Sequence, residues 1–364
     1  MSACDACLRR AWLVGELADH FERTDRRLET LRALLELGDS DLLRALVGDP
    51  SRRARLERAR ASFDAAAARS RCAAANVDPI CAHDGERYPQ RLSHIADAPA
   101  VLHVTGAGGA AALTDCSGVA IVGARRASAY GLETARSLGR DLAAAGVSVV
   151  SGMALGIDSA AHAGALEGGG QTIAVLPGGA DVAYPPSKRA LRERIVRSGC
   201  AVSELPPGVR PRRWCFPARN RLIAWLARLT IVVEAAQRSG ALITARAARE
   251  EGRDVGAVPG RVSSPLAEGT NALLRDGAYV ITDVQYALDV AYGVGARTAA
   301  RHPGVAALEP RLRRVFDAVG DGRDTVGALA AGSGTVDEAM IALAELELLG
   351  HLRRAAGGRY VPVA

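Results

Sequence analysis

Leucines recur at helical spacing through the first 75 residues of the chain. They occupy Leu28, Leu31, Leu34, Leu35, Leu42, Leu43 and Leu46. Apolar residues three and four positions apart share one face of a helix, and Gly or Pro commonly marks its ends. Such breaks fall near Gly38 and Pro50. We therefore predict helices throughout residues 8–75, the last of them a long Ala- and Arg-rich helix from about Ser51 to Ala75.

From Ile80 onward, short β-branched runs alternate with helical stretches. The predicted strands are 119–122, 147–150, 172–176, 201–204, 230–234, 255–258 and 278–281. The predicted helices lie near 130–145, 157–167, 187–198, 217–227, 241–251 and 266–275. Strands that are apolar on both faces and alternate with helices form a parallel sheet covered on both sides. The pattern predicts an α/β fold, a doubly wound parallel sheet whose ligands bind beyond the carboxyl ends of the strands.

The end of the chain has a third pattern. Helical periodicity returns at 310–319, 325–331 and 336–349, and two short apolar segments then flank Gly357 and Gly358. Three helices and a hairpin that turns on two glycines are typical of a winged helix. Such a domain could read duplex DNA or pack against a partner protein, and both alternatives stay open.

With 364 residues, the chain is long enough for two or three domains. We expect a helical (SAM-like) module at 1–78, a sheet core at 79–292, a linker at 293–304 and the winged helix at 305–364.

A net charge of +6 favours an anionic partner, and nearly all of the positive charge is arginine, since Lys188 is the only lysine. The chain starts without the basic and apolar segments of a signal peptide and has no apolar run long enough to span a bilayer. These features predict a cytoplasmic location without membrane contact. Of seven cysteines only Cys4 and Cys7 form a CxxC, so we expect reduced thiols and no metal site.

Arginines cluster in two turns of the predicted core. The first turn follows strand 119–122 and contains Gly123, Arg125, Arg126 and Ser128. Arginine and free amides at a strand end are suited to holding phosphate, and no GxGxxG dinucleotide motif is present.

The second turn is the densest basic and aromatic cluster of the chain. Its members are Arg210, Arg212, Arg213, Trp214, Phe216, Arg219 and Arg221. Interleaved arginines and rings suit single-stranded nucleic acid, because the charges follow the backbone and the rings stack on bases. Phe216 and Trp214 could instead anchor the following helix in the core.

Three further groups have both a structural and a functional interpretation. The Pro177-Gly178-Gly179 turn, with Lys188 beyond it, could receive a phosphate or only make the turn. Asp158 and His162 lie four residues apart and could do acid–base chemistry, but a structural role at the start of a helix is favoured. Glu234 could be catalytic, although pairing with a nearby arginine is preferred.

These segments, in this order, resemble the DprA/Smf family of bacterial DNA-processing proteins. The matching segments are AIVGARRASAYG, VVSGMALGIDSAAHAGAL, TIAVLPGGADVAYP, SELPPGVRPRRWCFPARNRLIAWLA, IVVEAAQRSGALITARAAREEGRDVGAVPG and EGTNALLRDGAYVITD, which span about 85–285. The resemblance implies an extended Rossmann-like core that binds single-stranded DNA without catalysis or cofactor, forms a homodimer and interacts with RecA recombinase. It implies a role in protecting incoming DNA and loading recombinase during natural transformation or related recombination.

The resemblance also assigns roles to residues of the two arginine turns. Arg125 and Arg213 would contact phosphates, Phe216 would stack on a base, and the glycine loops would line the site. The candidate DNA-binding residues are Gly123, Arg125, Arg126, Ser128, Gly178, Gly179, Lys188, Arg213, Phe216, Arg219 and Asn220.

The alternative is a nucleotide-binding or nucleoside-monophosphate-hydrolysing enzyme of a related Rossmann-like type. Asp158, His162 and Glu234 would form its acid–base set. Such enzymes have a Pro-Gly-Gly-x-Gly-Thr turn, whereas this chain continues with Ala180 and Asp181 after the two glycines.

Overall fold

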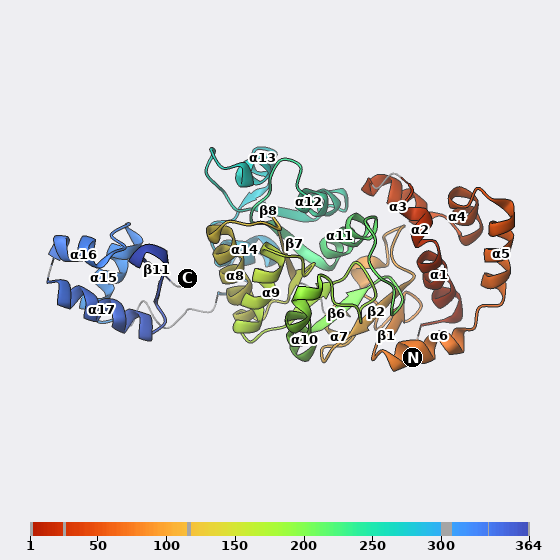
Figure 1. The fold of residues 1–364 in the computed structure, drawn as a ribbon, viewed down its shortest axis with the longest axis horizontal. Helices are drawn as coiled ribbons and strands as arrows, with labels where there is room; N and C mark the ends of the chain where they lie inside the picture. The colour runs from red at the N-terminus through yellow and green to blue at the C-terminus, as the bar shows by residue number, and fades with distance from the viewer. Residues whose placement is uncertain (1–2, 25–26, 115–117, 300–307, 334, 363–364) are drawn as a thin grey trace. The chain divides into compact units, whose positions relative to one another are not determined.

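The computed structural model describes residues 3–24, 27–114, 118–299, 308–333 and 335–362. The chain divides into two compact units, Met1–Ala299 and Ala300–Ala364 (Figure 1). The first unit joins the N-terminal helices and the sheet. The boundaries predicted within it, and the winged-helix assignment of the second, stay predictions.

A nine-stranded sheet forms the centre of the first unit, within the part of the chain that is described. Its strands are β1 (Asp78–Cys81), β2 (Val101–Thr105), β3 (Gly118–Val122), β4 (Val149–Ser151), β5 (Thr172–Val175), β6 (Cys200–Ser203), β7 (Ala227–Val232), β8 (Asp254–Ala257) and β9 (Tyr279–Val280). Their spatial order is β1-β2-β6-β5-β4-β3-β7-β8-β9, and all neighbours from β6 to β9 are parallel. The predicted doubly wound parallel sheet is confirmed.

The prediction missed β1 and β2, which extend the sheet by antiparallel pairing at its β6 edge. In β1, Asp78 and Pro79 interrupt the apolar run that marks a buried strand. Proline is tolerated there because β1 is an edge strand. An antiparallel edge also needs no crossover helix, so the alternation of strands and helices gave no sign of it.

Helices cover both faces of the sheet. They are α7 (Ala111–Thr114), α8 (Ala129–Ala144), α9 (Ile157–Glu167), α10 (Arg189–Ser198), α11 (Cys215–Leu226), α12 (Ala241–Glu250), α13 (Glu268–Arg275) and α14 (Val284–Tyr292). Strand β3 shows how the faces are filled. Val119 and Ile121 pack with α8, α9 and α14, whereas Ala120 and Val122 pack with α11 and α12. Successive residues of a strand point to opposite faces, so β3 is buried from both sides.

Among the residues that the structure describes, six helices precede the sheet. They are α1 (Asp5–Glu16), α2 (Ala18–Phe21), α3 (Leu28–Glu36), α4 (Asp39–Leu46), α5 (Pro50–Ala61) and α6 (Ala65–Ala74). The single long helix predicted from Ser51 to Ala75 is wrong. It divides at Asp64, whose carboxylate caps α6 by accepting the amide of Ala67 at 2.9 Å. The ring of Phe63, in the break, lies 5.6 Å from that of Trp12.

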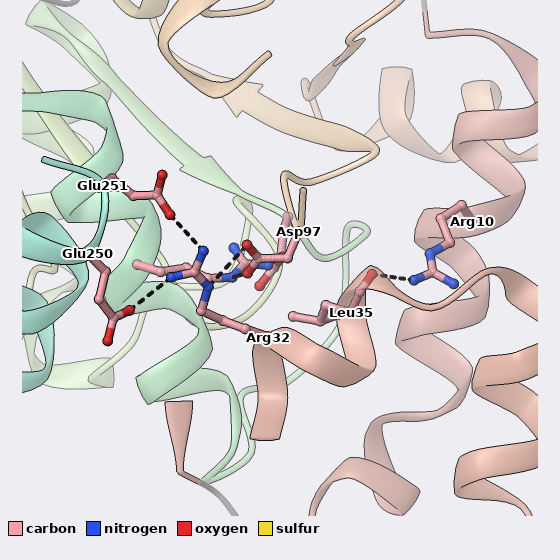
Figure 2. A network of polar contacts seen from close by, with 8 residues as sticks. Arg10, Arg32, Leu35, Asp97, Glu250 and Glu251 are labelled. Carbon is pink, nitrogen blue, oxygen red and sulfur yellow. Dashed lines mark hydrogen bonds and ion pairs between the residues drawn. The ribbon is translucent and has the colours of Figure 1, made fainter. Parts of the chain in front are cut away.

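An ion-pair network attaches these helices to the core (Figure 2). Arg32 of α3 lies 3.2 Å from Asp97, 2.9 Å from Glu250 and 2.7 Å from Glu251. On the far side of Asp97, the Nε of Arg221 in α11 lies 3.1 Å from the second carboxylate oxygen, in ion-pair contact without a hydrogen bond. Asp97 is therefore a buried anion shared by two arginines that come from different layers of the unit.

The second unit consists of α15 (Pro310–Gly320), α16 (Val326–Ser333) and α17 (Val336–Leu348), followed by the antiparallel pair β10 (Leu352–Arg354) and β11 (Tyr360–Pro362). Gly357 and Gly358 turn the chain between the two strands with positive φ angles of 78° and 71°. Part of the predicted linker, residues 293–304, lies outside the described residues. No helix in the described part of the chain is long and apolar enough to cross a membrane.

Candidate nucleic-acid site at the carboxyl edge of the sheet

The direction of winding reverses between β3 and β7. From β3 the chain proceeds through β4, β5 and β6 on one side, and from β7 it proceeds through β8 and β9 on the other. A crevice opens at such a switch point beyond the carboxyl ends of the strands. Here it is a pocket of about 340 Å³. Its lining includes Gly123, Arg125, Asp158, Arg219, Asn220 and Gly240.

The turn after β3 is held firmly on both sides. The amide of Ala124 donates to the carbonyl of Glu234 (2.7 Å), and the carbonyl of Ala124 accepts from the amide of Ile157 (3.2 Å). A Cβ at Gly123 would lie 2.6 Å from the side chain of Ile157 and 2.9 Å from the Glu234 carbonyl. Glycine is therefore needed for packing inside the protein, and the turn presents Arg125 at a fixed place on the rim.

Three side chains from separate segments meet on this rim. The guanidinium carbon of the exposed Arg125 lies 5.1 Å from the ring centre of Phe216, within the range of a cation–π contact. The ring of Tyr184 approaches Phe216 edge-on at 5.3 Å and is 36% exposed. This arrangement unites the two arginine turns predicted from the sequence and adds Tyr184, which sequence reasoning did not select. A tyrosine in a proline-rich turn at a strand end was the available signal.

The residues just before α11 separate into a core part and a surface part. Trp214 is fully buried and stacks on Phe21 at 4.5 Å, so for Trp214 the core-anchor interpretation is confirmed. Arg212 pairs with Asp19 of α2 at 2.7 Å. Arg213 is exposed, as is Arg126 in the first turn. Both therefore remain accessible to a polyanion.

Arg219 differs from these exposed arginines. It is 4% exposed, and its Nη1 donates to the carbonyls of Gly152 (2.7 Å) and Val175 at the ends of β4 and β5. Burial lowers the pKa of Arg219 to about 10. The guanidinium is therefore hydrogen-bonded to backbone carbonyls at the pocket wall, and the DNA-binding role of Arg219 stays a prediction. Its neighbour Asn220, which lines the pocket, accepts a hydrogen bond from the Nε of Arg219 at 3.2 Å and donates one to the Gly240 carbonyl at 3.1 Å.

Ser128 is also occupied within the protein. Its hydroxyl donates to Glu234 (2.5 Å) and accepts the amide of Gly131 (3.1 Å), capping α8. The Ser128 amide donates to the other carboxylate oxygen of Glu234 at 2.9 Å. The preferred pairing of Glu234 with an arginine is therefore wrong, and Ser128 supports the turn instead of offering a free hydroxyl.

The glycine loop after β5 is covered by the chain. The Gly179 amide donates to the carbonyl of Val209 at 2.8 Å, and both Gly178 and Gly179 are buried. A Cβ on Gly178 would lie 2.7 Å from that same carbonyl. This packing favours turn formation, and the DNA-binding role of these two glycines stays a prediction. Lys188, at the end of the short 3-10 turn η2 (Pro186–Lys188), is half-buried.

Asp158 and His162 do not act on each other. The Asp158 carboxylate accepts the amides of Gly152 (3.1 Å) and Ala154 (3.3 Å), and burial raises its pKa. The Thr172 hydroxyl donates to a backbone carbonyl, so Nδ1 of His162 donates to Thr172 at 2.6 Å. Burial lowers the pKa of His162 to about 3. The structural interpretation of both residues is confirmed.

The start of α12 closes the pocket opposite Arg125. Ser239, Gly240, Ala241 and Thr244 line it, and the Ser239 hydroxyl accepts the amide of Ala241 at 3.3 Å. The positive end of a helix thus faces the same space as Arg125, which favours an anionic ligand. The sequence shows this helix start as Ser-Gly before an apolar run. It does not show that the start faces the turn after β3.

The fold and site define a doubly wound α/β protein with a pocket at its switch point that is lined by Arg125 and Arg219, and with the ring of Phe216 in contact with Arg125. Residues 79–291 match the family DNA recombination-mediator protein A, and the chain belongs to that family. A putative DNA processing protein DprA from Mycobacterium tuberculosis is 44% identical over 236 residues. The match spans 64% of this chain and 61% of that relative.

Two solved structures are similar in fold. That of DprA from Streptococcus pneumoniae has a TM-score of 0.62 and 34% identity, and the match covers 79% of this chain and 98% of that one. The DprA structure from Helicobacter pylori has a TM-score of 0.52 and 32% identity, and the match covers 56% of this chain and 92% of that one. Its description concerns the single-stranded DNA binding mode of that protein.

Proposed function

We propose that this protein binds single-stranded DNA at the carboxyl edge of its sheet, without catalysis or cofactor. The observation that carries the proposal is that Arg125, which lines the switch-point pocket, contacts Phe216, whose ring also meets that of Tyr184. A ring with a cation beside it offers stacking to a base and charge to the adjoining phosphate, without demanding a particular sequence. The binding mode described for the Helicobacter pylori relative supports the same class of ligand.

In this proposal Arg125, Arg126 and Arg213 contact phosphates and Phe216 stacks on a base. Lys188 adds charge at the rim. Gly123, Ser128 and Arg219 hold the turns that present these groups. Asn220 forms part of the pocket wall.

The wider role follows from family membership. We propose that the protein acts in the cytoplasm as a homodimer, protects incoming single strands and helps to load RecA recombinase during natural transformation or related recombination. The family description as a recombination mediator supports this role.

The absence of catalysis is part of the proposal. The candidate acid–base residues are all engaged within the fold: Asp158 by two amides, His162 by Thr172 and Glu234 by Ser128. A nucleotide incubated with the protein is therefore expected to stay intact. Release of free base above the rate without protein would favour the enzyme alternative.

The test is fluorescence anisotropy of labelled oligo-dT at several salt concentrations. The Arg125→Ala/Arg213→Ala variant should bind more weakly. Each phosphate contact on a single strand contributes about −0.7 to the slope of log K (the association constant) against log salt, so losing two contacts should make that slope less negative by about 1.4.

A matched control removes two arginines from the opposite edge of the sheet. Arg197 and Arg275 lie at the carboxyl ends of α10 and α13, just before β6 and β9 begin, and both are exposed. Arg197→Ala/Arg275→Ala loses the same net charge and should leave the salt slope nearly unchanged. Equal losses in the two double variants would show that net charge, and not this rim, determines binding.

A further inference from the structure

Two pairs of potential metal ligands, far apart from each other in the sequence, converge beside the first strand. They are the thiols of Cys4, Cys7 and Cys81 and a ring nitrogen of His83, and all four atoms lie within 4.8 Å of one another. Nδ1 of His83 is 3.4 Å from Sγ of Cys4 and 3.3 Å from Sγ of Cys7. The sequence shows the CxxC half only, because more than seventy residues separate it from the Cys-x-His half.

These separations fit one small tetrahedral ion. Zinc binds sulfur at about 2.3 Å and imidazole nitrogen at about 2.0–2.1 Å, which places a sulfur and a nitrogen ligand about 3.6 Å apart and two sulfurs about 3.8 Å apart. Three cysteines and one histidine are a common closed ligand set of structural zinc sites. The described distances lie close to these values before any ion draws the ligands together.

The backbone around the cluster is suited to thiolates. Cys4 is the N-cap residue of α1 and Cys7 lies in its first turn, where unpaired helix amides and the helix dipole favour negative charge. The Cys4 amide donates to Sγ of Cys81 at 3.4 Å. Hydrogen bonds of this kind orient metal-bound sulfur and offset its charge. Cys7 and Cys81 are 8% and 1% exposed, whereas His83 is at the surface, so the ion has an entry side.

We propose that Cys4, Cys7, Cys81 and His83 hold a structural zinc ion. The four ligands fill a tetrahedral shell and leave no position for a substrate, so the site is structural and not catalytic. Each thiol binds as a thiolate and releases its proton to solvent. The ion ties the start of α1 to the end of β1, beside the hydrogen bond from the Ala3 amide to the Pro79 carbonyl (2.9 Å). It thereby fixes the first N-terminal helix to the antiparallel edge of the sheet. The proposal does not depend on DNA binding.

The first measurement is the metal content of the full-length protein, purified under reducing conditions with any histidine tag removed. We expect about one zinc per chain. Cys4→Ser and His83→Ala should each lose most of it. Cys72→Ser is the matched control, because Cys72 is also a buried thiol but belongs to no ligand group in the described residues. Cys72→Ser should keep its zinc.

A second measurement needs no variant and so does not depend on variant folding. The wild-type protein is stripped with a chelator and titrated with Co²⁺, whose tetrahedral thiolate complexes give intense d–d bands and a sulfur-to-metal charge-transfer band. We expect saturation near one equivalent and recovery of the melting temperature lost on stripping. Zinc should then displace the cobalt.

Three results would overturn the proposal. One is sub-stoichiometric zinc in wild-type protein that also fails to develop the tetrahedral cobalt spectrum. Another is a Cys4–Cys7 disulfide, found by mass spectrometry after alkylation of the native protein, which would assign the CxxC to redox chemistry. The third is equal zinc loss in Cys72→Ser and the ligand variants.

Discussion

Arg32 provides a direct test of how the N-terminal helices are attached to the sheet. Its side chain leaves α3 and reaches Asp97, Glu250 and Glu251 (Figure 2). Its guanidinium also lies 5.1 Å from the centre of the Trp225 ring. The substitution Arg32→Met retains an unbranched apolar stem over the tryptophan and removes the charge. Any large loss of stability then comes from the lost charge, through the ion pairs and the cation–π contact with Trp225.

The burial of the three partners sets the expected magnitude. The side chain of Asp97 is 0% exposed, whereas Glu250 and Glu251 are 34% and 24% exposed. An exposed ion pair contributes about 0.2–1 kcal/mol, and removing one partner of a buried pair costs about 3–5 kcal/mol. Asp97 keeps Arg221 at 3.1 Å, so its charge is not left alone. We expect Arg32→Met to lower the free energy of unfolding by about 2–3 kcal/mol, between those two limits.

Tryptophan fluorescence during urea unfolding measures this loss in the relevant unit alone. The three tryptophans of the chain, Trp12, Trp214 and Trp225, all belong to the unit Met1–Ala299. The control is Arg246→Met, because Arg246 pairs with Glu29 across the same junction at 2.9 Å and both side chains are more than half exposed. The control should lose less than about 1 kcal/mol.

Equal losses in Arg32→Met and Arg246→Met would refute the reasoning, because burial of Asp97 would then have no measurable effect. A double-mutant cycle with Asp97→Asn sharpens the result. If the Arg32 contact with Asp97 dominates, Arg32→Met should cost clearly less in the Asp97→Asn background, with a coupling of about 0.5–3 kcal/mol. A coupling of zero would assign the loss to the contacts of Arg32 with Glu250, Glu251 and Trp225.

Three further predictions concern the rim, the capped turn and acid stability. Phe216→Ala should weaken oligo-dT binding by about 1–3 kcal/mol through loss of one stacked base, whereas Phe216→Tyr should retain binding in the same anisotropy titration. Ser128→Ala removes the cap of α8 and a hydrogen bond to Glu234, and should cost about 1–2 kcal/mol in urea unfolding; an unchanged midpoint would contradict it. Burial lowers the pKa of His162 to about 3 and of His103 to about 4. Both stay neutral in the folded state while the unfolded chain binds protons below about pH 6.5, so stability should fall by about 1.4 kcal/mol per histidine for each pH unit between 6.5 and 4. A flat profile over that range would contradict this prediction.

Most of the elements that the sequence predicted well are buried on both sides, the exposed edge strand β9 being an exception. The helix at 157–167 has the bounds predicted for it, and the seven parallel strands fall where apolar β-branched runs were found. Burial on both faces makes such runs continuous, so they are visible without knowledge of their neighbours. The edge strand β1 was missed because Asp78 and Pro79 interrupt its apolar run, whereas the opposite edge strand β9 was found because the buried Ala278 and Ile281 flank it.

The site was harder to predict, because contacts between segments that are distant in the sequence decide which of the candidate residues are buried and which stay exposed. Gly178 and Gly179 have the composition of a phosphate-binding turn, and only the approach of the Val209 backbone shows that they are covered. Cys81 and His83 carry no motif by themselves, and β1 alone brings them to Cys4. The spacing of residues along the chain shows neither the covering of the glycine loop nor the convergence of these metal ligands.

In the segment RRWCFPARNR, the number of arginines in the sequence is larger than the number exposed to a ligand. Arg213 precedes α11 and is exposed, whereas Arg219 and Arg221, within the helix, are 4% and 1% exposed and hold strand ends and the Asp97 network. The rim therefore presents Arg125, Arg126 and Arg213, with Lys188 half-buried at its margin. Three or four cations imply a slope of log K against log salt of only about −2 to −3 for a short oligonucleotide, at about 0.7 per contact. A slope near −5 would instead require cations beyond this rim, such as the exposed Arg210, arginines of the second unit or those of a second copy of the chain. The salt slope of the wild-type protein thus tests whether one sheet edge accounts for the electrostatic part of binding.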